Sequence, residues 1–233
     1  IKDRGQSGHD NCLADTVRAA PNLLVSNSSV AQITDSSDGF TAFTSSGFTL
    51  GDNGEGTQSL ELNKSGNTFV SWSWKAGGSA SSNSDGSVSS SVSANATSGF
   101  SIVTWTGTGA TATIGHGLGA APKMIIIKSV TGASGWRVYH DGIGATKALV
   151  LETTAAADTA TDYFNDTAPT SSVFTVKANS TNDNTATMIA YCFAEKQGYS
   201  KFGSYTGNNN ADGTFVHTGF KPAFVIIKTT TTT

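Results

Sequence analysis

The chain has 233 residues, a formal net charge of -3 and only 13% charged residues. This length holds either one large β domain or two modules of about a hundred residues. The low charge excludes the basic surface that binds nucleic acid or an anionic membrane, which leaves proteins and neutral glycans as expected partners. No apolar run approaches the roughly 18 residues of a membrane span, so we expect none.

Glycine, serine, threonine and asparagine are abundant, with 26 glycines alone. These residues favour turns and disfavour helices, and β-branched and aromatic residues fill the short apolar runs between them. The composition therefore predicts an all-β fold.

A long repeat organises the chain. The segment that contains Pro122 and Lys128 returns 100 residues later around Pro222 and Lys228. The later part of the same module matches the start of the chain at an offset of 126, where LVLETT from Leu149 answers LLVSNS near the N-terminus. A shared offset over separated blocks identifies copies of one module.

The first copy, residues 1–77, is predicted to be a partial β-sandwich module that lacks its opening strands. Its closing strand begins at Thr68 with TFVSWSWKAG, and TMIAYCFAEK from residue 187 is the equivalent. Alternation places Val70, Trp72 and Trp74 on one face of this strand, which we expect to be the core face.

Residues 78–98 are rich in serine, glycine and asparagine and nearly free of apolar side chains. This composition is typical of a flexible or extended connector. The sequence therefore predicts a linker here, without a functional site.

Residues 99–197 are predicted to form one complete module, and residues 198–233 the start of a further one. The run 124–127 is apolar and β-branched, as in a strand covered on both faces. In the closing strand, Ile189, Tyr191 and Phe193 share the expected core face, whereas Ala190 and Cys192 share a face of small residues expected at the surface. Many short strands separated by turns predict tandem antiparallel β-sandwich modules of the jelly-roll kind.

Few side chains suggest chemistry. His116 precedes a glycine-containing turn at about the same place in its copy as His217, which favours a structural role. The histidines, cysteines and carboxylates lack the spacing of a metal site, and no nucleophile elbow is present. We therefore predict no catalytic residue, no metal, no cofactor and no enzymatic activity.

The best candidate contact patch lies in GWRVYHD. Trp136, Tyr139 and His140 combine aromatic rings with polar groups, as residues that stack on sugars or anchor protein interfaces do. Alternation argues against it, because Trp136 and Val138 share one face while Arg137 and Tyr139 share the other. At least one of the two aromatic rings is therefore expected in the core.

Three blocks carry a resemblance: GYSKFGSYTGN from Gly198, SSGFTLG from Ser45 and TFVSWSWKAGG from Thr68. Together they resemble a repeated module of large structural proteins of tailed phages, notably marine phages of cyanobacteria, often found beside lectin-like or SPRY-like domains. The resemblance implies a virion protein exposed to the extracellular medium, in a tail fibre, appendage or surface decoration. The resemblance implies no catalytic residue.

The leading hypothesis is a non-enzymatic virion structural protein whose sandwiches serve as spacers and contact modules. Its partners would be other virion proteins, further copies of itself, for example in a trimer, and host-surface glycans. A glycan-binding adhesin module is the alternative, and a polysaccharide-degrading enzyme is a weaker third, because no pair of carboxylates stands out. The incomplete copies also raise the idea that one subunit completes the next by strand donation, although a truncated sequence explains them more simply.

Overall fold

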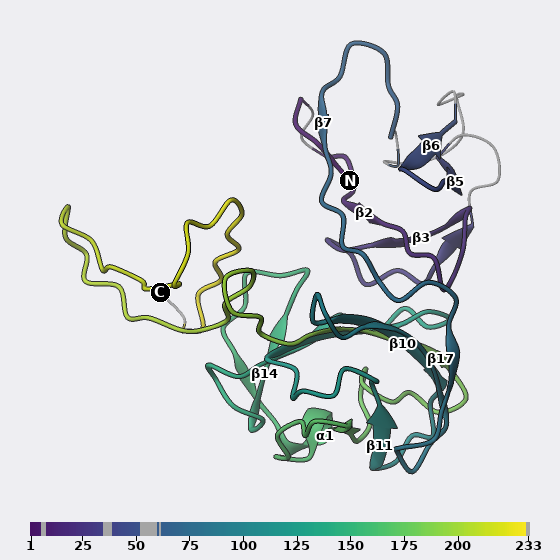
Figure 1. The fold of residues 1–233 in the computed structure, drawn as a ribbon, viewed down its shortest axis with the longest axis vertical. Helices are drawn as coiled ribbons and strands as arrows, with labels where there is room; N and C mark the ends of the chain where they lie inside the picture. Colours follow the sequence, from purple (N-terminus) through teal and green to yellow (C-terminus); the bar gives the residue numbers. More distant parts are fainter. Residues whose placement is uncertain (6–7, 35–38, 52–59, 61, 232–233) are drawn as a thin grey trace.

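The structure is a computed structural model that describes residues 1–5, 8–34, 39–51, 60 and 62–231. In these residues the regular secondary structure consists of antiparallel strands and one short helix, so the prediction of an all-β antiparallel sandwich is confirmed. In Figure 1 a smaller N-terminal unit lies on one side of a large sheet, and a second layer covers the other side. The C-terminal segment projects away from both.

The large sheet contains eight strands in the order β15-β14-β13-β12-β17-β10-β9-β8. In chain order they are β8 (Ser81–Asn83), β9 (Ser90–Asn95), β10 (Phe100–Thr106), β12 (Met124–Ser129), β13 (Arg137–His140), β14 (Lys147–Val150), β15 (Asp158–Thr159) and β17 (Thr187–Phe193). The central strand β17 pairs with β10 on one side and β12 on the other.

Both faces of this sheet are buried. Ile125 and Cys192 point into one hydrophobic core, whereas Ile102, Ile189 and Tyr191 belong to another core on the opposite face. Because successive residues of a strand point to opposite faces, a strand buried on both sides carries a continuous apolar run, as β12 does at residues 124–127.

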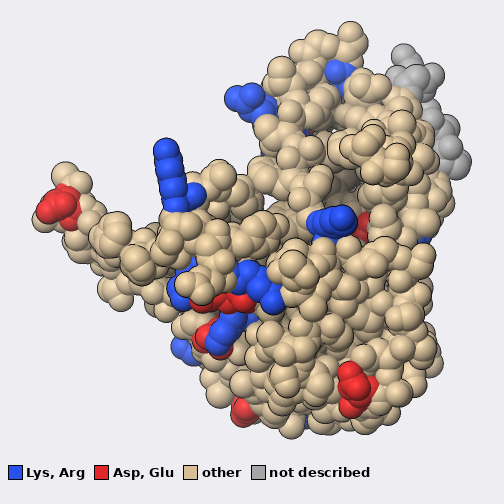
Figure 2. Space-filling view, in the orientation of Figure 1, with Lys and Arg blue, Asp and Glu red and all other residues tan. Residues whose placement is uncertain are grey.

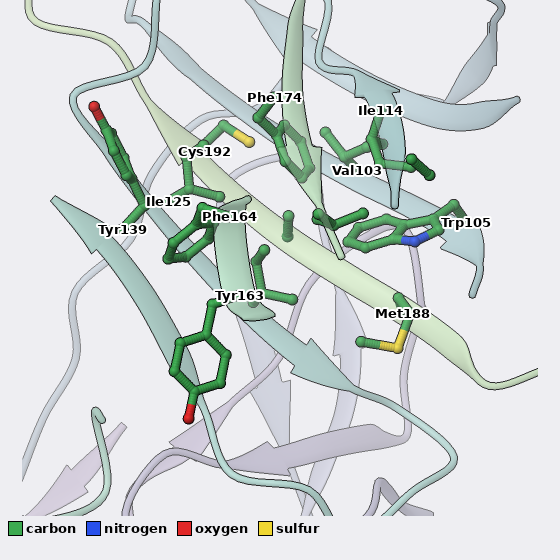
Figure 3. Close-up of a cluster of buried hydrophobic side chains, with 14 of the residues drawn as sticks. Val103, Trp105, Ile114, Ile125, Tyr139, Tyr163, Phe164, Phe174, Met188 and Cys192 are labelled. Atoms are coloured by element: carbon green, nitrogen blue, oxygen red, sulfur yellow. The ribbon is translucent and has the colours of Figure 1, made fainter. Parts of the chain in front are cut away.

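The second layer consists of β11 (Ala112–Gly115), β16 (Val173–Val176) and the helix α1 (Thr161–Phe164). Figure 3 shows Ile114 and Phe174 from this layer directed at the side chains of the large sheet. Trp105 of β10 meets Phe174 edge to face, with ring centroids 5.8 Å apart. This layer and the sheet together form the sandwich.

The prediction of a linker at 78–98 is wrong. β8 and β9 lie within this range, and β9 pairs with β10 through residues 91–95. The turn between β8 and β9 also packs closely against β11, because a Cβ at Gly86 would collide with the backbone of Thr113. These serine-rich strands at the end of the sheet are held chiefly by backbone hydrogen bonds, and Val92 of β9 alone enters the main core as a buried residue, so the side chains give little sign of them.

The N-terminal unit is made of small sheets. Its strands are β1 (Lys2–Asp3), β2 (Cys12–Leu13), β3 (Asn22–Val25), β4 (Ile33–Thr34), β5 (Phe40–Phe43), β6 (Phe48–Leu50) and β7 (Phe69–Val70). β1 pairs with β7, β2 and β4 flank β3, and β5 pairs with β6. A core around Leu23, Val25 and Phe40 holds these strands together.

The repeat is visible in the strand register. In the first copy Lys2 pairs with Val70, and in the complete copy Lys128 pairs with Ile189, which are the equivalent positions at offsets of 126 and 119. The copies differ elsewhere: β16 pairs with β11, whereas its equivalent β6 pairs with the neighbouring β5. In the first copy this strand thus pairs with its neighbour in the chain, whereas in the complete module it pairs with β11, which lies about 60 residues earlier.

Two expectations about the closing strand are wrong. Trp72 and Trp74 are 47% and 43% exposed, and residues 71–76 form no ladder with a strand of the described chain. Ala190 and Cys192 are fully buried beneath the second layer, not at the surface. Their small size leaves room for the aromatic rings of that layer.

The segment after β17 contains no strand among its described residues and is largely exposed. It remains near the body through a bridge between Lys196 and Ser200 and through Phe202, whose ring lies 6.3 Å from that of Phe193. Further along, Lys228 donates to the carbonyl oxygen of Thr153 at 2.8 Å.

Candidate functional site

The predicted contact patch does not form a surface. Trp136 is fully buried and Tyr139 is 2% exposed, and they lie in the cores on opposite faces of the sheet. His140 is half-buried, with its ring 6.3 Å from that of Phe202. The patch prediction is therefore wrong for both aromatic rings, whereas the alternation predicts only that at least one of them lies in the core.

Trp136 instead lies at the junction between the two units. The core around it includes Phe100, Ile102 and Tyr191 from the large sheet and Leu24 from β3 of the N-terminal unit. These residues meet although some are more than a hundred positions apart in the chain. One continuous apolar core therefore connects the two units.

The Trp136 indole adds directional contacts. Its Nε1–H donates to the carbonyl oxygens of Val25 at 2.9 Å and Ser28 at 3.1 Å, both in the N-terminal unit. A further backbone bond runs from the Gln32 amide to the Val130 carbonyl oxygen at 2.8 Å. Buried polar groups of this kind must be paired, so these contacts fix how the units meet.

A buried charged network completes the junction. The Tyr191 hydroxyl donates to Oδ2 of Asp15 at 2.7 Å, and Nε of Arg18 donates to the same oxygen at 2.6 Å. The other oxygen of Asp15 accepts the amides of Val17 and Arg18. Arg18 also reaches Gln32 through Nη1 at 3.2 Å. The carboxylate is thus fully coordinated by donors from both units.

Burial sets the electrostatics of this network. Burial raises the pKa of Tyr191 well above its usual value, so the phenol stays neutral and donates. For Arg18, burial acts to lower the pKa, but Tyr191 and Asp15 outweigh it and the pKa is raised. The network therefore contains one carboxylate and one guanidinium, a balanced pair out of contact with water.

Lys128, at the end of β12, is a second buried cation at the junction. Its Nζ donates to the carbonyl oxygens of Ser29 at 3.3 Å, Ser129 at 2.8 Å and Gly132 at 3.1 Å. Burial lowers its pKa to about 8, with Glu152 acting weakly in the opposite direction. Because Ser29 belongs to the N-terminal unit, this lysine also bridges the two units.

His116 has the structural role expected from its turn. It is fully buried, its Nε2 contacts the carbonyl oxygen of Thr170 at 3.2 Å, and its Nδ1 accepts the Leu118 amide at 3.2 Å. Burial lowers its pKa. Both ring nitrogens are thus occupied by backbone groups.

Within the described ranges, no group of three metal-ligating side chains is present, and no helix is long and apolar enough to cross a membrane. A surface depression of about 480 Å³ lies between Lys75–Gly78 and Ala94–Thr97. Apart from Lys75 and Asn95, its lining is small side chains and backbone, so it presents no converging acid, base and nucleophile. The junction is the most elaborate arrangement of polar groups in the described part of the chain.

A protein-family model covers the full sequence. Residues 1–233 match the model of a domain of unknown function, DUF7483. The chain belongs to the DUF7483 family. No curated protein and no solved structure matches it. The family description names no activity, so the function of this member has to be argued from its own architecture.

Proposed function

We propose that this DUF7483 chain is a non-enzymatic structural protein of a tailed-phage particle, in a tail fibre, appendage or surface decoration. Its sandwich modules act as spacers and as contact surfaces for other virion proteins or the host surface. The observation that carries the proposal is the junction, where a shared apolar core and buried polar contacts join the N-terminal unit to the complete module.

A spacer has to hold successive modules at a fixed angle. A flexible connector does not achieve this, whereas a junction with a buried tryptophan and a buried ion pair does. The side-chain network from Asp15 to Tyr191 has geometric requirements that an apolar contact lacks. Such a junction, repeated along tandem copies, builds an extended and stiff protein.

The surface suits contacts between proteins. Figure 2 shows a face that is largely uncharged, with positive and negative groups interleaved. The ion pairs of the chain include Lys123 with Asp141 at 3.0 Å and Lys201 with Glu195 at 2.8 Å. Paired charges create little long-range field, which favours protein contacts, including other copies of the chain as in a trimer, over nucleic acid.

The proposal is tested on purified particles from a culture whose phage encodes the chain. Mass spectrometry should find the protein in particles banded in a density gradient, and immunogold microscopy should place it on the outer surface. Washed particles that lack the protein would overturn the proposal. Sugar release from host polysaccharide by the purified chain would overturn its non-enzymatic part.

A glycan-binding adhesin module is the second candidate. The patch that first suggested it is buried, but Trp72 and Trp74 offer exposed aromatic faces of the kind on which sugar rings stack. A glycan array with the intact chain and with Trp72→Ala decides the matter. Binding that the substitution abolishes supports this function, and a blank array removes it.

A further inference from the structure

The loop after β3 forms one side of the junction between the N-terminal unit and the complete module. Residues 26–32 connect β3 to β4. Nζ of Lys128 donates to the Ser29 carbonyl oxygen at 3.3 Å, and the Gln32 amide donates to the Val130 carbonyl oxygen at 2.8 Å. The loop therefore holds the end of β12 and the residues after it by one side-chain bond and one backbone bond.

The complete module has an equivalent loop. At the offset of 126, β14 and β15 correspond to β3 and β4 to within one residue. Both pairs of strands are antiparallel hairpins, and the connecting loops, residues 26–32 and 151–157, have the same length. Because hairpins of the same length present their loops in the same way, residues 151–157 are expected to offer the same backbone groups.

The segment after the complete module contains the equivalents of the two residues that the first loop holds. Lys228 and Thr230 lie 100 residues after Lys128 and Val130. Among residues 221–231, Lys228 and Thr230 are partly buried and the others are exposed. The segment therefore rests on the rest of the protein through these two residues.

Both contacts of the first junction recur in the second loop. Nζ of Lys228 donates to the Thr153 carbonyl oxygen at 2.8 Å, and the Ala157 amide donates to the Thr230 carbonyl oxygen at 3.1 Å. Ala157 is the last residue before β15, as Gln32 is the last before β4. The acceptor of the lysine is shifted by one place along the loop.

Backbone groups explain how the contact survives a change of loop sequence. The two loops read SNSSVAQ and LETTAAA, so their side chains differ almost throughout. The loop contributes a carbonyl oxygen and an amide, which every residue except proline supplies. The following copy contributes the lysine, which the repeat keeps.

The buried ion pair of the first junction is not repeated. At the offset of 126, Asp141 and Gly144 take the places of Asp15 and Arg18. Gly144 has no guanidinium, and Asp141 pairs with Lys123 at 3.0 Å. The lysine and the backbone bond are thus the part of the junction that both loops share.

We propose that residues 151–157 are the docking surface for the following copy of the module, which they hold through the Lys228 ammonium and the Thr230 carbonyl oxygen. The partner is the next copy in the same chain, because its own lysine already reaches the loop. Each copy thus presents its hairpin loop to the strand end of the next, as in proteins whose repeats contact only their neighbours. The spacer role of this contact rests on the proposed function, whereas the contact itself is tested on the purified chain, so the two fail separately.

Hydrogen exchange of single amides in the full chain tests the docking surface. The Ala157 amide should be protected in the unsubstituted chain. Lys228→Met removes the charged donor and should speed exchange at Ala157 about tenfold or more, because the segment loses its second bond to the loop. Lys221→Met, at an exposed lysine of the same segment, should leave it unchanged. Lys128→Met should speed exchange at Gln32 in the same way.

Three results would overturn the proposal. One is an unprotected Ala157 amide in the unsubstituted chain. Another is an equal effect of Lys228→Met and Lys221→Met at this amide. The third is that Lys128→Met exposes Gln32 while Lys228→Met leaves Ala157 protected, which would show that the two loops do not hold their partners alike.

Cysteine cross-linking tests whether the partner belongs to the same chain. Ala157→Cys and Thr230→Cys in one chain should be joined by a short bismaleimide into a cross-linked monomer, since a backbone hydrogen bond links these residues. The native Cys12 and Cys192 are buried and do not compete. A double-cysteine chain that stays unlinked would contradict the proposal. Cross-linked dimers from a mixture of the two single-cysteine chains would show that the loop takes a copy from another chain, which also contradicts it.

Discussion

Replacing Trp136 tests whether the junction couples the two units. Trp136→Phe keeps an aromatic ring in the core but removes the N–H that serves the carbonyl oxygens of Val25 and Ser28. Loss of a buried donor costs about 1–3 kcal/mol of unfolding free energy. Trp136→Ala also leaves a cavity in a fully buried site, for which the cost is about 3–5 kcal/mol.

The effect should appear in the N-terminal unit, although the substitution lies in the large sheet. The appropriate measurement is hydrogen exchange of Leu23, Leu24 and Val25, together with urea unfolding of the full chain. We expect Trp136→Phe to increase exchange at these amides about tenfold or more, since 1.4 kcal/mol corresponds to a factor of ten. Strands of the large sheet that are distant from the junction should change less.

Trp105→Phe is the matched control. The Trp105 indole is also buried and also donates, to Oδ1 of Asn182 at 3.0 Å, but its core lies inside the complete module. Trp105→Phe should lower the unfolding free energy of the complete module by a similar amount, without a specific increase in hydrogen exchange at the β3 amides. If both substitutions change exchange in β3 equally, the units unfold together and the junction has no local role. If Trp136→Phe leaves β3 unchanged, the coupling argument is refuted.

Three further outcomes are expected. Asp15→Asn should cost about 3–5 kcal/mol in urea unfolding, because it leaves the buried Arg18 guanidinium without its counter-charge, and a cost below 1 kcal/mol would show that solvent reaches the pair. From pH 8 to pH 10.5 the stability of the unsubstituted chain relative to Lys128→Met should rise by up to about 3 kcal/mol, because the pKa of Lys128 is lowered to about 8 in the folded chain, so the unfolded chain binds the extra proton in this window. The difference is the relevant quantity because burial raises the pKa values of Tyr191 and Cys192, which lowers the stability of both chains in the same window. A difference that does not change with pH would contradict the assignment. Val92→Ala should cost about 1–3 kcal/mol by thermal unfolding if β9 belongs to the sandwich, whereas Ser91→Ala on the other face should cost little, and equal small effects would indicate a connector after all.

Alternation and repetition predict the all-β sandwich well. The pattern separates the two faces of β17 correctly, with Ile189 and Tyr191 on one side and Ala190 and Cys192 on the other. Periodicity does not say which faces are covered, because that depends on a layer contributed by distant strands. Cys192 was therefore assigned to the surface, although the second layer buries it.

The junction was harder to predict. Its parts are ordinary in sequence: no motif marks Asp15 or Arg18, and Trp136 belongs to the predicted contact patch. Only the fold brings them to Tyr191, about 175 residues away from the turn. The alternation of Trp136 with its neighbours indicated that one aromatic ring of GWRVYHD is internal, and it was the only available sign.

The repeated lysine shows how a module feature becomes a junction feature. In each copy the lysine at this position donates to backbone carbonyl oxygens: Lys2 to His9, and Lys228 to Thr153. In the complete module Lys128 does the same within its own turn, but its third contact is Ser29 of the preceding unit. A group that satisfies the end of a strand thus also registers a neighbouring module. In the proposed spacer function, this contact would help to fix the angle between successive copies.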